Sequence, residues 1–364
     1  MKNVIKSLLV MLTAISFSVA NAGELSITGS AKASYSITSS DGSAAQIEQG
    51  KGLGVTNEFS LSASGELDNG MSWNYKQDID GNTTQDDAQL TLTTDIGTFG
   101  VFISEGGLDT DNTASQSVIS RPSDTSFNEG MFDTFDLSGA NTLQYHTPAD
   151  LLPFGITAKI AYAPSSSSAG SVNDYKATGA ANLGTFTASS TGFNSTAAPF
   201  AQTSAMGKTA THYQVKASPI DGLNIGADYV DYDGVVGAPE QQPESGSYYL
   251  TYAAGPATIG YSKSYAAFAI GNRATNIAES VEATKYSIGL NVNDNLSVSY
   301  EHEESNPDHM LATYTDYTME ATGIQAAYTM GGMTLAVAMN SFENAQYTNN
   351  KDVDDYVFSV AMAF

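Results

Sequence analysis

The stretch that decides the fold is residues 25–37, which read Leu25-Ser26-Ile27-Thr28-Gly29-Ser30-Ala31-Lys32-Ala33-Ser34-Tyr35-Ser36-Ile37. Apart from Gly29, the odd positions are apolar, and every even position is polar. Successive side chains of a β-strand point to opposite faces, so a period of two places each set on its own face. The stretch therefore predicts a strand that is apolar on one side and polar on the other.

The same alternation recurs along the chain in about 18 segments. They are centred on residues 25–37, 55–63, 71–79, 90–92, 99–103, 143–147, 156–162, 175–177, 186–188, 213–217, 223–229, 248–252, 257–261, 286–292, 296–300, 324–328, 335–339 and 356–364. The weakest are 143–147 and the pair around Tyr175 and Phe186, which could instead belong to loops.

The connections between these segments alternate in length. Long polar loops alternate with short sequences of good turn chemistry, namely Asp68-Asn69-Gly70, Asp95-Ile96-Gly97, Asn182-Leu183-Gly184, Pro219-Ile220-Asp221-Gly222, Gly255-Pro256, Asn293-Asp294-Asn295 and Gly331-Gly332. Transmembrane barrels are built in this way, with turns at one end and loops at the other. We therefore predict an all-β fold, a transmembrane antiparallel β-barrel. A soluble β-sandwich or β-helix is the alternative, and the aromatic residues near strand ends argue against it.

Residues 1–22 have the features of an export signal. Lys2 and Lys6 precede a short apolar run over residues 8–17, and Ala20-Asn21-Ala22 is a cleavage motif. The run is shorter than the ~20 residues of a membrane-spanning helix, which counts against the alternative of an anchor. We expect cleavage before Gly23, leaving residues 23–364 as one barrel domain.

The overall composition excludes several classes of protein. The chain has 39 acidic and 14 basic residues, so a nucleic acid would be repelled. It has no cysteine, which excludes a disulfide scaffold, a thiolate metal site and a lipoprotein anchor.

The chain resembles the general porins of Gram-negative outer membranes over its whole mature length. The resemblance rests on the export signal, the opening Leu25-Ser26-Ile27-Thr28-Gly29-Ser30-Ala31, a long third loop, and the last segment Tyr356-Val357-Phe358-Ser359-Val360-Ala361-Met362-Ala363-Phe364. It implies a barrel of about 16 strands, one hairpin fewer than the alternating segments counted above, so the prediction is a barrel of about 16 to 18 strands. It also implies a homotrimer, contact with outer-membrane lipid and lipopolysaccharide, and recognition of Phe364 by the outer-membrane assembly machinery.

A barrel of this size is too wide for its side chains to fill, so it leaves a water-filled channel. The longest connection, residues 105–138 between the fifth and sixth strands, is the third loop, and the resemblance implies that it folds inward. We predict that its carboxylates form an acidic pore constriction, with Arg121 as the single basic residue, from Asp109, Asp111, Asp124, Glu129, Asp133 and Asp136. An ordinary solvated outer loop is the alternative.

The parity of the alternation assigns charges to the two faces of the barrel. Six lysines fall on the polar, lumen-facing side of their strands and are predicted to form a basic pore wall: Lys32, Lys76, Lys159, Lys176, Lys216 and Lys285. Inward carboxylates include Glu58, Glu66, Asp78, Asp228, Glu301 and Glu303. Together with the loop carboxylates they make the lumen negative on balance, which favours cations over anions.

The histidines and acidic clusters bear on catalysis and on metal binding. The histidines at 146, 212, 302 and 309 are scattered and form no catalytic motif, so we expect no enzyme activity. We expect no cofactor, although acidic clusters at residues 78–87, 301–309 and 352–355 could hold Ca²⁺ or Mg²⁺ weakly. None of them has the spacing of a dedicated calcium loop.

The sequence therefore predicts an outer-membrane porin for passive diffusion of small hydrophilic solutes and ions, with a preference for cations. Two alternatives stay open. One is a channel of the same architecture whose constriction binds a specific solute. The other is a surface barrel without a channel, such as an adhesin or a structural protein.

Overall fold

A computed structural model of the chain describes residues 25–42, 50–80, 83–104, 107–124, 131–135, 137, 140–164, 185–186, 204–205, 209–233, 241–268, 278–309 and 315–364. Its strands are β1 (Leu25–Gly42), β2 (Gly50–Glu66), β3 (Ser72–Asp80), β4 (Thr83–Thr94), β5 (Gly97–Ile103), β6 (Thr142–His146), β7 (Thr157–Ala163), β8 (Thr185–Phe186), β9 (Ser204–Ala205), β10 (Thr209–Ile220), β11 (Leu223–Asp233), β12 (Glu244–Ala254), β13 (Ala257–Ala267), β14 (Ala278–Asn291), β15 (Leu296–His309), β16 (Met319–Met330), β17 (Met333–Glu343) and β18 (Lys351–Ala363). Three short 3-10 helices lie in connections: η1 (Pro122–Asp124), η2 (Pro153–Gly155) and η3 (Ala345–Tyr347). No helix in these ranges is long and apolar enough to cross a membrane.

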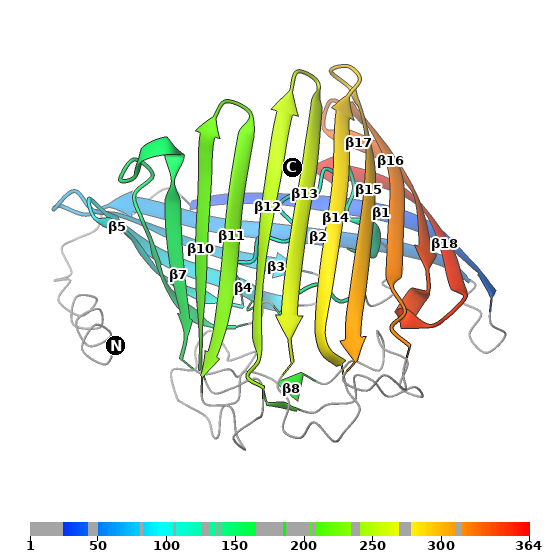
Figure 1. The fold of residues 1–364 in the computed structure, drawn as a ribbon. Coiled ribbons are helices and arrows are strands. Elements are labelled where there is room, and N and C mark those ends of the chain that lie inside the picture. The colour runs from blue at the N-terminus through cyan, green and yellow to red at the C-terminus, as the bar shows by residue number, and fades with distance from the viewer. Residues whose placement is uncertain are drawn as a thin grey trace.

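Sixteen of the strands form one closed antiparallel barrel (Figure 1), as predicted. Each barrel strand pairs with the next barrel strand along the chain, with β7 next to β10, and β1 pairs with β18 to close the sheet. The weak segment around residue 145 is the barrel strand β6. Phe186 instead belongs to β8, which pairs with β9 in a separate two-stranded sheet. The segment at 175–177 lies outside the described residues.

The two faces of the barrel differ in polarity, as the period of two requires. Large apolar side chains on the outer face are strongly exposed, among them Val55, Tyr248, Ile324 and Phe358. Their sequence neighbours on the inner face are mostly polar, as Ser247 and Gln325 illustrate, and both are buried. The outside of the barrel is therefore an apolar surface, and the inside is hydrophilic.

The connections also follow the predicted asymmetry. Hairpins at Gly70, Gly222, Gly255 and Gly331 lie at one end of the barrel, and the strand ends that border the longer connections lie at the other (Figure 1). Gly222 has a φ of 78°, and a Cβ on it would lie 2.5 Å from the carbonyl oxygen of Ala253, so only glycine fits this turn. The predicted turn at 182–184 lies outside the described residues. The connection from β6 to β7 was not predicted as a turn, and it contains η2.

The barrel closes where its first and last strands meet. The backbone N–H of Phe364 donates to Gly29 O at 2.9 Å, and the N–H of Gly29 donates to Phe364 O at 2.8 Å. The Phe364 ring packs on Phe59 with ring centroids 5.6 Å apart, and it covers Gly29 so closely that a Cβ there would lie 2.8 Å from it. The glycine that interrupts the apolar pattern of the first strand thus makes room for the last residue.

The inner face is apolar near the long-loop end, which the simple alternation does not predict. Val230 and Val281 are fully buried inward residues there. They pack in one cluster with Phe135 and Leu137, which belong to the connection between β5 and β6. These contacts bury apolar area inside the barrel and fix the returning end of that connection.

Candidate pore constriction

The connection from β5 to β6, residues 104–141, is called loop 3 below, and its described parts, residues 107–124, 131–135, 137 and 140–141, fold into the barrel. Residues 107–124 cross the inner wall from β10 to β16 and bond to inward side chains in order along the way. The Ser262 hydroxyl donates to Asp111 O at 2.7 Å, and the Ser287 hydroxyl to Ala114 O at 2.6 Å. Further along, the N–H groups of Val118 and Ile119 donate to Ser299 Oγ and Gln325 Oε1 at 3.1 and 2.9 Å. The predicted inward fold of the third loop is confirmed.

Loop 3 begins at a buried polar anchor on β10 and β11. The Leu108 N–H donates to His212 Nδ1 at 3.1 Å, so the imidazole proton lies on Nε2, which is 3.2 Å from Asp228 Oδ2. Asp228 Oδ1 accepts from the Thr110 N–H and hydroxyl at 2.8 and 2.9 Å and also from the Ser247 hydroxyl. A carboxylate with this many donors is well satisfied even though it is buried.

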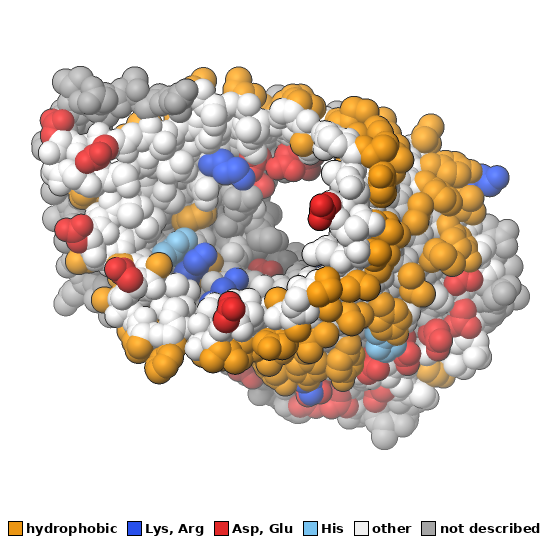
Figure 2. All heavy atoms as spheres, turned by 90° about the horizontal axis from the view of Figure 1, so that it is seen from above, with side chains coloured by type: hydrophobic (Ala, Val, Ile, Leu, Met, Phe, Trp, Pro, Cys, Tyr) orange, Lys and Arg blue, Asp and Glu red, His pale blue; other side chains and the backbone are white. Residues whose placement is uncertain are grey.

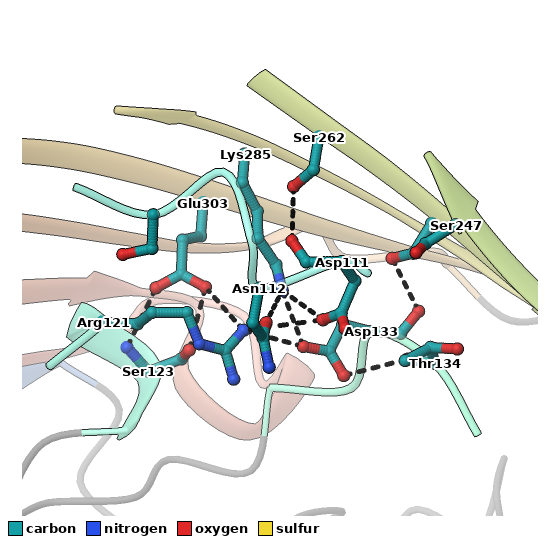
Figure 3. A network of polar contacts seen from close by, with 12 residues as sticks. Asp111, Asn112, Arg121, Ser123, Asp133, Thr134, Ser247, Ser262, Lys285 and Glu303 are labelled. Atoms are coloured by element: carbon teal, nitrogen blue, oxygen red, sulfur yellow. Dashed lines mark hydrogen bonds and ion pairs between the residues drawn. The ribbon is translucent and has the colours of Figure 1, made fainter. Parts of the chain in front are cut away.

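An ionic network joins the middle of loop 3 to β14 and β15 (Figure 3). Lys285 Nζ lies 2.8 Å from a carboxylate oxygen of Asp111 and 2.8 Å from one of Asp133. Arg121 lies 2.9 Å from the same Asp133 oxygen and 3.5 Å from Glu303. These five residues, called the loop 3 latch, combine two cations and three carboxylates, of which all but Arg121 and Asp133 are almost fully buried.

Glu303 also holds the 3-10 helix η1 in loop 3. Its oxygens accept from the Ser123 N–H at 3.1 Å and from the Ser123 hydroxyl at 2.9 Å. Its neighbour on the same face, Glu301, accepts from the hydroxyls of Ser115 and Ser117. The carboxylates of β15 thus bind the loop through three of its hydroxyls, one backbone N–H and the Arg121 guanidinium.

Burial and charge shift the pKa values of the loop residues in the latch. Burial, and then the neighbouring Asp133, raises the pKa of Asp111 to about 7, against the opposing effect of Lys285. The pKa of Asp133 is lowered despite its burial, because Lys285 and Arg121 both contact it. The pKa of Arg121 is raised by Asp133 and Glu303 despite burial, so it stays charged. Asp111 is therefore the loop carboxyl in the latch that changes charge near neutral pH.

The structure places the six predicted loop carboxylates in different environments. Asp111 and Asp133 face the wall and bind Lys285, while Asp124 is half-exposed and lies 2.7 Å from Arg121. Asp109 is partly exposed near Lys216. Glu129 and Asp136 lie outside the described residues.

The predicted wall lysines are likewise divided. Lys285 is in the latch, and Lys76 pairs with Asp78 at 2.5 Å, where Asp78 also accepts from the Ser60 hydroxyl. Lys159 and Lys216 lie diagonally across β7 and β10, close enough for their charges to repel. Lys32 is exposed on the inner face of β1. Lys176 lies outside the described residues.

Sequence reasoning missed the role of His212 and the position of Arg121 between Asp133 and Glu303. Parity does place His212 on the inner face with Gln214 and Lys216, and Asp228 opposite Gln214 on the next strand. Parity thus gives the face of the barrel that each side chain occupies. It does not give the residue that the side chain contacts, because that residue is in loop 3, far away in the sequence. In the described ranges, no group of three or more histidines or carboxylates has the geometry to hold a metal ion.

An opening runs through the barrel, as the view from above in Figure 2 shows. Lysine, arginine, aspartate and glutamate side chains reach its edge, whereas apolar side chains gather on the outside of the barrel. The described part of the molecule is thus a hollow cylinder with a charged interior that is partly filled by loop 3.

Comparisons with known proteins give a fold but no family. No family model matches the chain, and no curated protein matches its sequence. Several solved structures match over 94% of the chain. Salmonella typhi OmpF in a complex with daunomycin has a TM-score of 0.63 and 12% sequence identity, with 98% of that chain covered. A loop-deletion mutant of OmpT, an outer membrane protein of Vibrio cholerae, has a TM-score of 0.59, and an anion-selective porin from Comamonas acidovorans has one of 0.58, each with 12% identity and 100% of that chain covered. At such low identity, the likeness shows that the chain shares the porin barrel fold.

Proposed function

We propose that this protein is an outer-membrane porin through which small hydrophilic solutes diffuse passively, with cations preferred over anions. The observation that carries the proposal is the sorting of side chains around an opening: apolar residues outside, polar and charged residues inside. An outer band of exposed Leu, Val, Ile, Tyr and Phe side chains is unfavourable in water and suits lipid. A hydrophilic inner face around an opening suits water and ions.

The comparisons support the barrel channel but leave its charge selectivity open. One of the matching structures is described as an anion-selective porin, so this fold does not by itself imply a preference for cations. The preference for cations therefore rests on the charges of this chain. The latch and its neighbour Asp124 contribute four carboxylates and two cations, and the exposed Glu58 lies on the inner face of β2. With all these groups ionised, the interior near loop 3 is negative and attracts cations.

Three further parts of the proposal rest on the sequence and the resemblance. Residues 1–22 direct export and are removed before Gly23. The barrel assembles as a homotrimer in the outer membrane, in contact with lipid and lipopolysaccharide. Phe364 and the alternate apolar residues of β18 are recognised during assembly, and the pairing of Phe364 with Gly29 is compatible with that role.

The test is electrical. Residues 23–364, refolded in detergent and added to a planar lipid bilayer, should produce stepwise increases in conductance. In a KCl gradient, the reversal potential should have the sign of a cation-selective channel. Absence of any conductance from a correctly folded barrel would contradict the channel, whereas an anion-selective potential would contradict only the assigned selectivity. Cross-linking in detergent tests the trimer separately.

A further inference from the structure

Three glycines interrupt the inner face of the barrel beneath loop 3. Gly260 is in β13, Gly289 in β14 and Gly323 in β16. They pair with Ser287, Ser299 and Glu301 on the neighbouring strands β14, β15 and β15. All three pairing partners are buried inward residues that bond to loop 3. The three glycines therefore face the loop.

At each of these glycines the loop occupies the space of the missing side chain. A Cβ on Gly260 would lie 1.8 Å from the carbonyl oxygen of Ala114, and a Cβ on Gly323 would lie 2.7 Å from Pro122 Cγ. At Gly289 the fit is less tight, with Gln116 Cβ at 3.1 Å and Gln116 O at 3.3 Å. Glycine inside a strand weakens it and often marks the close approach of another segment. Here that segment is loop 3, which approaches Gly260 with its backbone and Gly323 with the ring of Pro122.

The contact at Gly260 is with backbone and cannot be relieved by a side-chain rotation. The Ala114 carbonyl is also held by the Ser287 hydroxyl at 2.6 Å, and the loop is fixed on one side of it by the latch and on the other by Ser299. A methyl group at position 260 would have to lift the loop by about 1 Å, because packed atoms cannot overlap. Because position 260 is part of the sheet, separating the Ala114 carbonyl from it moves the loop away from the wall and into the interior of the barrel.

We propose that Gly260 determines the width of the channel and therefore the size of the solutes that pass. Because these three positions have no side chain, loop 3 lies directly on the sheet, and its closest contact with the sheet is at Gly260. This inference rests on the proposed function, since it assigns a residue that sets the size selectivity of that same channel.

The experiment compares Gly260→Ala with Gly54→Ala. Gly54 is an inner-face glycine of β2, where the nearest atom to an added Cβ is Ser34 Oγ at 3.7 Å, so alanine fits without displacing anything. Single-channel conductance and the largest polyethylene glycol that enters the channel are measured for both variants and for the native protein. Gly260→Ala should lower the conductance on the order of a fifth and admit only smaller polymers. Gly54→Ala should match the native channel.

Gly289→Ala provides a second variant in case Gly260→Ala does not fold. Its contacts are milder, so it should fold and cause a smaller decrease in the same direction. The inference is wrong if folded Gly260→Ala conducts like Gly54→Ala. It is also wrong if Gly260→Ala fails to fold and Gly289→Ala leaves conductance and polymer size unchanged. A native barrel without any conductance would instead contradict the proposed function.

Discussion

The inner face of the barrel has two regions with the same sequence pattern and different roles. In the region under loop 3, from β10 to β16, inward polar residues such as His212, Lys285 and Glu303 are buried and bound to the loop. On β1 and β2, inward residues such as Lys32 and Glu58 are exposed to the interior. Alternation therefore tells which face a residue occupies. Whether that residue contacts water or holds a loop depends on a segment elsewhere in the chain.

The largest contrast between the two regions should come from removing a lysine in each. Lys285→Met removes the cation closest to Asp111 and leaves Arg121 to serve both Asp111 and Asp133. Breaking a buried pair in this way costs about 3–5 kcal/mol. Lys32→Met should change the free energy of unfolding by no more than about 0.5 kcal/mol, as is usual at exposed sites. Unfolding of the refolded barrels in urea measures both. Equal effects would show that the latch does not stabilise the fold.

A smaller decrease in the free energy of unfolding is expected for a substitution that affects the start of loop 3. Asp228→Asn keeps the shape of the side chain, but its amide nitrogen cannot accept the bonds that one carboxylate oxygen now receives. Because His212 is fixed with its proton on Nε2, the mutant leaves at least one buried donor unsatisfied, at about 1–3 kcal/mol. We expect a lower free energy of unfolding and faster proteolysis within loop 3. A stability equal to that of the native protein would contradict the anchor.

Charge removal on the open region should affect selectivity more than stability. Glu58→Gln removes an exposed carboxylate from the inner face of β2, so the interior becomes less negative and the reversal potential should shift toward zero. Glu320→Gln, on the outer face of β16, is the control and should leave the reversal potential unchanged. If both substitutions shift it equally, the carboxylate at 58 does not act from the lumen.

The smallest effect should be a change of selectivity with pH. The pKa of Asp111 is raised from 3.8 to about 7, so this carboxyl is neutral below that pH and negative above it. As pH rises through 7 the interior gains negative charge, and the preference for cations should increase. Asp111→Asn should remove part of this increase. An identical pH dependence in the native protein and the mutant would show that another group causes it.

The sequence determined the barrel and its faces because both follow from local periodicity. The stretch from Leu25 to Ile37 predicted β1, and the parity of Lys285 predicted its inward direction. Parity could not identify the residues that bind Lys285, because nothing near Lys285 in the sequence indicates Asp111 and Asp133. The same holds for Gly260, which could equally have marked a bulge. Contacts between a loop and a distant strand depend on how the whole barrel closes.

The pairing of Gly29 with Phe364 also bears on how the cylinder forms. Every other pairing in the barrel joins a barrel strand to the next barrel strand along the chain, with β8 and β9 lying between β7 and β10, so the strands can pair one after another. Until the first and last strands meet, however, the sheet has two free edges that can template aggregation. Phe364 extends the seam in which residues 30–42 of β1 pair with residues 351–363 of β18. Its removal should therefore weaken closure of the barrel and favour self-association through the free edges.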